Sequence, residues 1–349
     1  MDKDTQLTRP KLYDENINPD FNTKIIDGNS SCVVASRLNR LGDIAKKNFK
    51  LQASNFWTPE EVNLKADALQ WKTLDPDYKY AVKVVLSYIN FLDSKMSIMP
   101  SDISKYLSLN EFHLPLAFQM GMEAMHTHSY SYIYEELMDV DEETETAKLF
   151  FEDPILNDRI NEVVKYTQAL SDNATLENLN KAILSIFILE GIYFFNGFNF
   201  FYYLESNGIL PNVAKILSTI NRDEVSHLIL FKEIIKVLKE DGQWVLTEEQ
   251  VYEQFQKAVD VETTFSVNLF SPRFLPFTEQ KIRDFVQHLA NKRLSFIGYK
   301  DNPFKKYKSN PFKIFSRFEP EGDTQTKEVN TLIGVNMDYQ KVSDKDLDW

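Results

Sequence analysis

Cysteine is almost absent from this sequence of 349 residues, because Cys32 is the only one. A single thiol allows no internal disulfide and no cysteine-based metal site. A chain without disulfides is typical of a reducing compartment, so we expect a cytoplasmic protein. The first ten residues, MDKDTQLTRP, contain no apolar stretch and give no indication of a secretory signal.

Glycine is also scarce, with 10 residues, whereas phenylalanine (26) and tyrosine (16) are common. Because glycine supplies the positive φ of many tight turns, its scarcity argues against a many-stranded β fold and favours long helices. No stretch shows the alternation of apolar and polar residues that is typical of a strand. The formal net charge of −13 disfavours a nucleic-acid or membrane partner, because an anionic surface would repel the chain.

One apolar run, ILSIFILEGIYFFNGFNFFYY at 183–203, approaches the ~20 residues of a membrane span. Glu190, Asn196 and Asn199 interrupt it, and a charge at the centre of a bilayer costs at least about 2.5 kcal/mol. A helix that is apolar on all sides is otherwise the central helix of a large bundle. We therefore expect a core helix, in which the presence of Glu190 needs an explanation.

The chain is predicted to be all-α and to have three parts. Residues 1–30 are polar and aperiodic, which indicates an extended arm. Residues 31–300 have helical periodicity and are expected to form one helical domain. Residues 301–349 are interrupted by prolines and poor in apolar residues towards the end, which predicts a flexible tail.

Two capping boxes indicate where helices begin. Thr58 and Glu61 form one around Pro59, and Thr247 and Gln250 form the other. From these signals and the apolar periodicity we expect helices at 36–53, 59–71, 77–98, 102–108, 110–138, 155–171, 175–204, 211–240, 247–270 and 278–296.

Two E-x-x-H pairs, EAMH at 123–126 and EVSH at 224–227, lie in predicted helices. Residues i and i+3 share one helix face, so both polar groups of a pair point the same way. A lone carboxylate precedes each pair, namely Asp93 by 30 residues and Glu190 by 34. This separation brings two positions level in a pair of antiparallel helices, so we expect two helix hairpins with one carboxylate and one E-x-x-H each.

All six polar groups lie on apolar helix stripes and should point into the core. An unpaired buried carboxylate costs several kcal/mol, and four of them would repel one another. Two divalent cations would offset these charges, and mixed carboxylate and imidazole ligands suit iron or manganese. Four carboxylates and two histidines from four helices form the dimetal site of ferritin-like bundles. The predicted metal ligands are Asp93, Glu123, His126, Glu190, Glu224 and His227.

Each of these features alone has a simpler interpretation. A single E-x-x-H in a helix is often a surface accident, a core histidine is usually just hydrogen-bonded, and Glu190 could form a buried salt bridge. Two pairs on apolar stripes, each with a carboxylate at hairpin spacing, favour the dimetal site over these alternatives.

The neighbours of the predicted ligands have two interpretations each. Tyr130 lies four residues after His126 on the same stripe, so it should approach the metals without binding them. It is either a core tyrosine bonded to a carboxylate or a redox-active one. Phe194, Phe198 and Ile220 either protect a radical from water or are ordinary core residues. Asp223 could accept a hydrogen bond from a ligand histidine.

These residues resemble the small, radical-generating subunit of class I ribonucleotide reductase. The resemblance runs from about Leu41 to the C-terminus. It rests on the segments FWTPEEV (56–62), LDS (92–94), EAMHTHSY (123–130), LEGIYFF (189–195) and RDEVSH (222–227). The resemblance implies a ferritin-like bundle and a role for the six predicted ligands as the family's metal ligands.

The resemblance also assigns the residues of the radical chemistry. It places the stored radical on Tyr130, inside an apolar pocket of Phe194, Phe198 and Ile220. It places the electron-transfer tryptophan at Trp57 and its aspartate partner at Asp223. The tail tyrosine that relays the radical would be Tyr339, and the terminal Leu347-Asp348-Trp349 would dock on the large subunit.

The activity implied is the activation of O₂ at the metals and the transfer of an oxidising equivalent to the large subunit, which reduces ribonucleotides. The family usually forms homodimers. HTHSY, LEGIYFF, FVQHLANKRL and the terminal tryptophan resemble the chlamydial-type branch. Members of this branch use a manganese/iron pair, typically have Phe at the position of Tyr130 and tend to have Glu at that of Asp93. Because Tyr130 and Asp93 are kept, two iron ions are expected, with manganese/iron as the alternative. A related dimetal oxidase or monooxygenase is the alternative function.

Overall fold

The computed structural model describes residues 2–313 apart from residues 17, 19 and 31. The helices of this part are α1 (Gly42–Ser54), α2 (Lys65–Thr73), α3 (Pro76–Met96), α4 (Met99–Ser104), α5 (His113–Leu137), α6 (Val140–Glu152), α7 (Pro154–Asp172), α8 (Leu176–Ile188), α9 (Phe195–Ser206), α10 (Pro211–Glu240), α11 (Glu248–Phe270) and α12 (Glu279–Phe296). A π-helical turn, η3 (Leu189–Tyr193), joins α8 to α9, and the 3₁₀ turns η1 (Pro59–Glu61) and η2 (Asn110–Phe112) lie before α2 and α5. Only isolated β-bridges, and no strand, occur in the described residues, so the predicted all-α class is confirmed.

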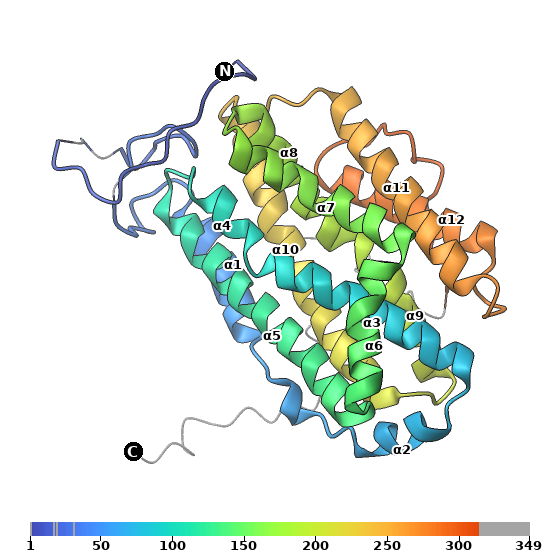
Figure 1. Ribbon diagram of the computed structural model, residues 1–349. Helices are drawn as coiled ribbons and strands as arrows, with labels where there is room; N and C mark the ends of the chain where they lie inside the picture. The colour runs from blue at the N-terminus through green and yellow to red at the C-terminus, as the bar shows by residue number, and fades with distance from the viewer. Residues whose placement is uncertain (1, 17, 19, 31, 314–349) are drawn as a thin grey trace, which may run out of the picture. The chain divides into compact units, whose positions relative to one another are not determined.

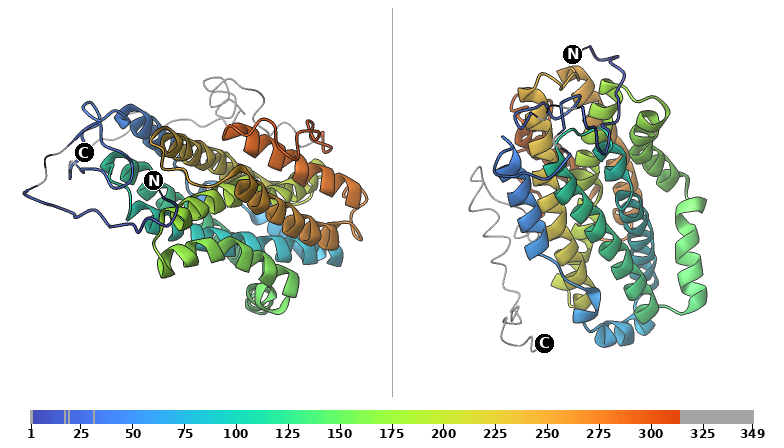
Figure 2. Two further views of the ribbon diagram at one scale, coloured as in Figure 1. Left: turned by 90° about the horizontal axis from the view of Figure 1, so that it is seen from above. Right: turned by 90° about the vertical axis from the view of Figure 1, so that its left-hand side faces the viewer.

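The long helices run side by side and form a ferritin-like bundle (Figures 1 and 2). α10 packs against α9, α5 and α1, and α3 packs against α5. α7 packs against α8. α11 and α12 pack against each other and against the π turn. The core therefore lies between α3, α5, α8, α9 and α10.

The segment 176–206 is the central element of this core. It has the length and hydropathy of a membrane span, but its whole apolar window is buried inside the structure. Residues 182–202 are buried without exception, because the segment is apolar on every face and other helices cover each of them. The predicted core helix is thus confirmed, although it is interrupted by the π turn.

Residues up to Pro311 form one compact unit. In the first 30 residues, Ile25 and Ile26 are completely buried. Gln243, just after α10, donates to the Ile26 carbonyl at 2.7 Å and accepts from its N–H at 3.2 Å. Of the predicted tail, residues 314–349, including Tyr339 and Leu347–Trp349, lie outside the described residues.

Helix α6, Val140–Glu152, was not predicted from the sequence. Asp139 caps its first turn by accepting from the Glu142 N–H at 2.9 Å, and three acidic residues in that turn favour the positive end of the helix dipole. The acidic sequence has no apolar stripe that would predict a helix, so the helix depends on its cap and its packing on α3 and α7.

The prediction of a single helix at 59–71 is wrong. The capping box at Thr58 forms, with the Thr58 N–H donating to Glu61 at 3.1 Å, but it caps only one 3₁₀ turn. Asn63 accepts from the Lys65 N–H at 3.0 Å, and α2 begins there. The helix predicted from residue 36 begins only at Gly42, after Asn39 has accepted from the Leu41 N–H at 2.8 Å.

Candidate metal centre

Four core elements supply the six predicted ligands. Asp93 lies near the end of α3, Glu123 and His126 lie in the middle of α5, Glu190 lies in the π turn, and Glu224 and His227 lie on α10. All six side chains have 0% exposure. The apolar stripes therefore direct all six groups into the core, as the sequence predicts.

The six residues form two overlapping donor groups. The first donor group is Asp93, Glu123, His126 and Glu224, and the second donor group is Glu123, Glu190, Glu224 and His227. In each group, one ligand atom per residue lies within 4.8 Å of the others. Glu123 and Glu224 belong to both groups, so the two groups share two carboxylates.

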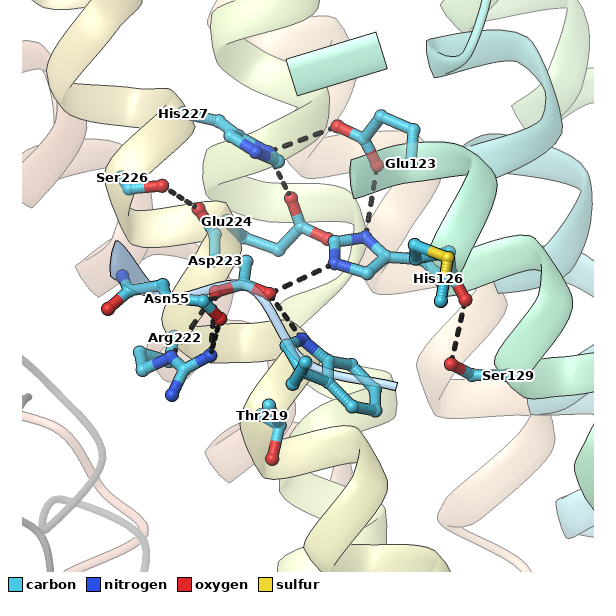
Figure 3. A network of polar contacts seen from close by, with 12 residues as sticks. Asn55, Glu123, His126, Ser129, Thr219, Arg222, Asp223, Glu224, Ser226 and His227 are labelled. Atoms are coloured by element: carbon cyan, nitrogen blue, oxygen red, sulfur yellow. Dashed lines mark hydrogen bonds and ion pairs between the residues drawn. The ribbon is translucent and has the colours of Figure 1, made fainter. Parts of the chain in front are cut away.

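His126 lies between the carboxylates of Glu123, Glu224 and Asp223 (Figure 3). Its Nδ1 is 3.1 Å from Glu123 Oε2 and 3.2 Å from Glu224 Oε1. Its Nε2 is 3.4 Å from Asp223 Oδ2. When Nε2 carries the proton and donates to Asp223, the Nδ1 lone pair is free to bind a cation.

His227 is placed in the same manner in the second donor group. Its Nδ1 is 2.9 Å from Glu224 Oε2 and 3.0 Å from Glu123 Oε1. Asp93 Oδ1 and Glu190 Oε2 have no hydrogen-bond partner among the described residues, although both atoms are buried. Unpartnered carboxylate oxygens next to imidazole nitrogens are a donor set that fits two transition-metal ions.

The buried carboxylates of the cluster repel one another, and this repulsion shifts their pKa values. Burial, together with the charges of Glu224 and Glu123, raises the pKa of the Asp93 carboxyl well above its usual range. The same causes raise the pKa of Glu190. For Glu224, burial acts in the same direction, but the His126 charge and the hydrogen bonds from both histidines outweigh it and lower its pKa.

The carboxylates also raise the pKa of the two imidazoles. Burial works against their charged form, but the Glu224 charge raises the pKa of His126 and the Glu123 charge raises that of His227. A cation bound by these groups would compete with protons, so metal binding is expected to release protons.

Glu190 reaches the cluster from an irregular part of its helix. The structure has a π-helical turn at Leu189–Tyr193, where the sequence suggests an uninterrupted helix. π turns in α-helices are frequent at functional sites, because the extra residue redirects a side chain. No signal in the apolar periodicity marks this turn, since all of its residues are buried.

Tyr130 lies beside the first donor group. Its phenol donates to Asp93 Oδ2 at 2.6 Å, and the side chain has 0% exposure. Phe194, Phe198 and Ile220 are also completely buried, and the Phe194 and Phe198 rings stack with centroids 5.9 Å apart.

A hydrogen-bonded chain leads from His126 towards the outside of the bundle. Trp57 Nε1 donates to Asp223 Oδ2 at 2.7 Å, the same oxygen that lies near His126. Arg222 holds the other oxygen, with Nη2 at 3.1 Å and Nε at 3.2 Å, and also donates to the Asn55 carbonyl at 2.7 Å (Figure 3). The pairing of Trp57 with Asp223 follows the resemblance, whereas the part of Arg222 was not predicted.

Gln119 is a further residue that the sequence reasoning missed. It is completely buried, and its Nε2 lies 2.9 Å from Glu190 Oε1 and 3.4 Å from Glu123 Oε1. A signal was present, because Gln119 precedes Glu123 by four residues and so lies one turn away on the same stripe.

Comparison with known proteins gives consistent matches. Residues 43–311 match the protein family described as "Ribonucleotide reductase, small chain". The beta subunit of ribonucleoside-diphosphate reductase from Treponema pallidum is 27% identical over 303 residues, which are 86% of each chain. Its counterpart from Halalkalibacterium halodurans is 29% identical over 310 residues, 86% of this chain and 89% of that one. The solved ribonucleotide reductase R2 subunit from Clostridium botulinum matches with a TM-score of 0.85 and 29% identity, over 90% of this chain and 99% of that one.

Proposed function

The chain belongs to the ribonucleotide reductase small-chain family, and on this basis we propose that it generates and stores a radical for a class I ribonucleoside-diphosphate reductase. The single observation that carries this proposal is the pair of donor groups sharing Glu123 and Glu224, with Tyr130 bonded to Asp93 at 2.6 Å. The two features together supply a place for two ions and an oxidisable side chain next to them.

The six clustered residues are the proposed metal ligands. His126 and Asp93 would help to hold one ion, His227 and Glu190 the other, and Glu123 and Glu224 would contribute to both. When bound, the ions supply the activation of O₂ and the oxidising equivalent that the protein stores. We propose two iron ions, because carboxylates and imidazoles suit iron and the chain has Tyr130 in place; a manganese/iron pair is the alternative.

Tyr130 is the proposed site of the stored radical. Burial and the Asp93 charge raise the pKa of its phenol well above the usual range, so the phenol stays protonated. Loss of an electron from the ring must then be accompanied by loss of the phenolic proton. Asp93 Oδ2, which already accepts a hydrogen bond from this group, is in place to take that proton. Phe194, Phe198 and Ile220 would exclude water from the radical.

Trp57, Asp223 and His126 form the proposed route by which the oxidising equivalent leaves the site. Asp223 contacts both the indole N–H of Trp57 and the imidazole of His126, so a single carboxylate connects the indole to a proposed metal ligand. Trp57 is 3% exposed, which keeps water away from the ring during transfer. Tyr339 is the proposed next carrier.

The partner that follows from the family is the large subunit of the reductase, which binds the ribonucleotide. We propose that the C-terminal residues, ending in Trp349, dock on it, and that the small subunit is a homodimer. Light scattering of the purified chain tests the second point, since a monomer at micromolar concentration would contradict it.

Metal reconstitution tests the proposal as a whole. The purified protein is loaded with Fe(II) without oxygen, with and without Mn(II), and then exposed to air. Metal counting should give about two ions per chain, and electron paramagnetic resonance should show a sharp tyrosyl signal in the iron-only sample. Fewer than one ion per chain would contradict the metal centre. Two ions without a tyrosyl signal, and activity only with Mn(II), would favour the manganese/iron alternative.

A further inference from the structure

The π turn at Leu189–Tyr193 changes the register of the central helix. An α-helix turns by about 100° per residue, so Glu190 and Phe198 would lie about 80° apart around an uninterrupted helix. A π turn takes up one extra residue, which brings the two positions to within about 20° of one face. The turn therefore decides whether Glu190 and Phe198 can both face the same side of the helix.

A π turn needs support, because its backbone carbonyls lose their regular i+4 donors. Arg159 of α7, which is 1% exposed, supplies one such donor through the bond from its Nη2 to the Tyr193 carbonyl. Its guanidinium also pairs with the buried Glu262 of α11 and lies 3.8 Å from the centroid of the Tyr88 ring. The charge is thus neutralised by a residue outside both donor groups.

Arg293 of α12 supplies a second donor, to another carbonyl of the π turn. It is 4% exposed, and its Nε donates to the Gly191 carbonyl at 3.1 Å. A β-carbon on Gly191 would lie 3.0 Å from Cγ, Cδ and Nε of Arg293. The arginine stem therefore lies flat against the turn, in space that only glycine leaves open. Its guanidinium carbon is 4.8 Å from the centroid of the Phe195 ring.

We propose that Arg159 and Arg293 are positioning residues, which hold the π turn from two sides and thereby direct the Glu190 carboxylate into the second donor group. The inference rests on the proposed function, because it takes Glu190 as a ligand. The hydrogen bonds that carry the inference run from Arg293 and Arg159 to the carbonyls of residues one and three positions after Glu190.

A purely structural role would have a different consequence. Arginines that only stabilise the core would, when changed, weaken the whole bundle and both metal-binding steps equally. Arginines that direct Glu190 would affect one step selectively, namely the step that Glu190 itself controls. Selectivity between the two steps is therefore the decisive quantity.

Anaerobic Mn(II) titration of the full-length chain, followed by electron paramagnetic resonance, measures both steps. The variants are Arg293→Lys and Arg159→Lys, which keep the charge but lose the planar group, and Gly191→Ala, which displaces Arg293. Glu190→Gln identifies the step that depends on Glu190. Arg273→Lys is the control, because Arg273 also donates to a helix carbonyl, that of Leu269 at 2.8 Å, but at the end of α11.

We expect Arg293→Lys and Gly191→Ala to weaken the Glu190-dependent step by about tenfold or more, and the other step by less than about twofold. Hydrogen exchange of the amides of residues 189–195 should be faster in these variants than in Arg273→Lys. Folded variants with both steps unchanged, or with both weakened equally, would overturn the inference. If Arg159→Lys does not fold, the other two variants decide. A wild-type chain that binds fewer than two Mn(II) would instead contradict the proposed function.

Discussion

The phenolic oxygen of Tyr130 lies 2.6 Å from Oδ2 of Asp93, while the other oxygen of this carboxylate has no hydrogen-bond partner among the described residues. One oxygen is thus available for a cation and the other holds the tyrosine. This division makes Asp93 the link between the metal centre and the side chain that we propose to carry the radical.

Tyr130→Phe should remove the tyrosyl signal in electron paramagnetic resonance and leave the metal content at about two ions per chain, because the phenol is not a proposed ligand. Tyr134→Phe, one helical turn further along α5 and also buried, is the matched control and should keep the signal. A signal that survives in Tyr130→Phe would place the oxidant elsewhere.

Glu224→Ala should lower metal binding more than Asp93→Ala does, because Glu224 belongs to both donor groups and Asp93 to only one. Equilibrium dialysis with Fe(II) under argon measures the number of ions per chain. Glu233→Ala, a position two to three turns along the same helix, controls for general effects on α10. Equal loading of Glu224→Ala and the wild type would refute the ligand assignment.

Cation binding should stabilise the folded protein, because it offsets the repulsion of four buried carboxylates. At free Mn(II) a hundred times the dissociation constant, the free energy of unfolding should rise by about 2.7 kcal/mol for one site. Urea unfolding with and without Mn(II) measures this difference. Mg(II), which prefers oxygen ligands and keeps its waters, should have a smaller effect. Equal stabilisation by both ions would argue against imidazole ligation.

Asp223→Asn should slow radical transfer to the large subunit by about 10- to 100-fold, while Tyr130 is still oxidised. An asparagine has one acceptor oxygen in place of two, so Trp57, His126 and Arg222 can no longer all be satisfied. Turnover with the large subunit and the tyrosyl signal are measured in the same preparation. Asp241→Asn, at the far end of α10, is the control. Unchanged turnover in Asp223→Asn would remove Asp223 from the route.

Truncation after residue 325 should abolish ribonucleotide reduction with the large subunit but leave radical formation unchanged. The physical reason is that the six clustered residues and Tyr130 all precede residue 228, whereas Tyr339 and Trp349 are lost. Normal turnover by the shortened chain would contradict the proposed docking and relay.

The helices and the cluster of donors follow from the sequence, because both depend on local periodicity. Two E-x-x-H pairs on apolar stripes had to point inward, and the spacing of Asp93 and Glu190 had to bring them level. The acidic helix α6 escaped prediction, since its stability comes from the Asp139 cap and from packing rather than from an apolar stripe.

The contacts of Arg159 and Arg293 with the π turn could not be predicted in the same way. Arg159 and Arg293 lie on helices far from Glu190 in the sequence, and each looks like an ordinary surface-type residue within its own helix. Only the three-dimensional packing shows that both reach the π turn. Gln119 differs, because its spacing of four residues from Glu123 is enough to place it on the same helix face.

The sharing of Glu123 and Glu224 between the two donor groups has a consequence for assembly. If these residues are the metal ligands, a first cation would fix two carboxylates that a second cation also needs, and the second position would be reshaped before it is filled. Loading would then be a sequence of dependent events, and the order in which iron or manganese arrives would decide which mixed or matched pair the protein contains.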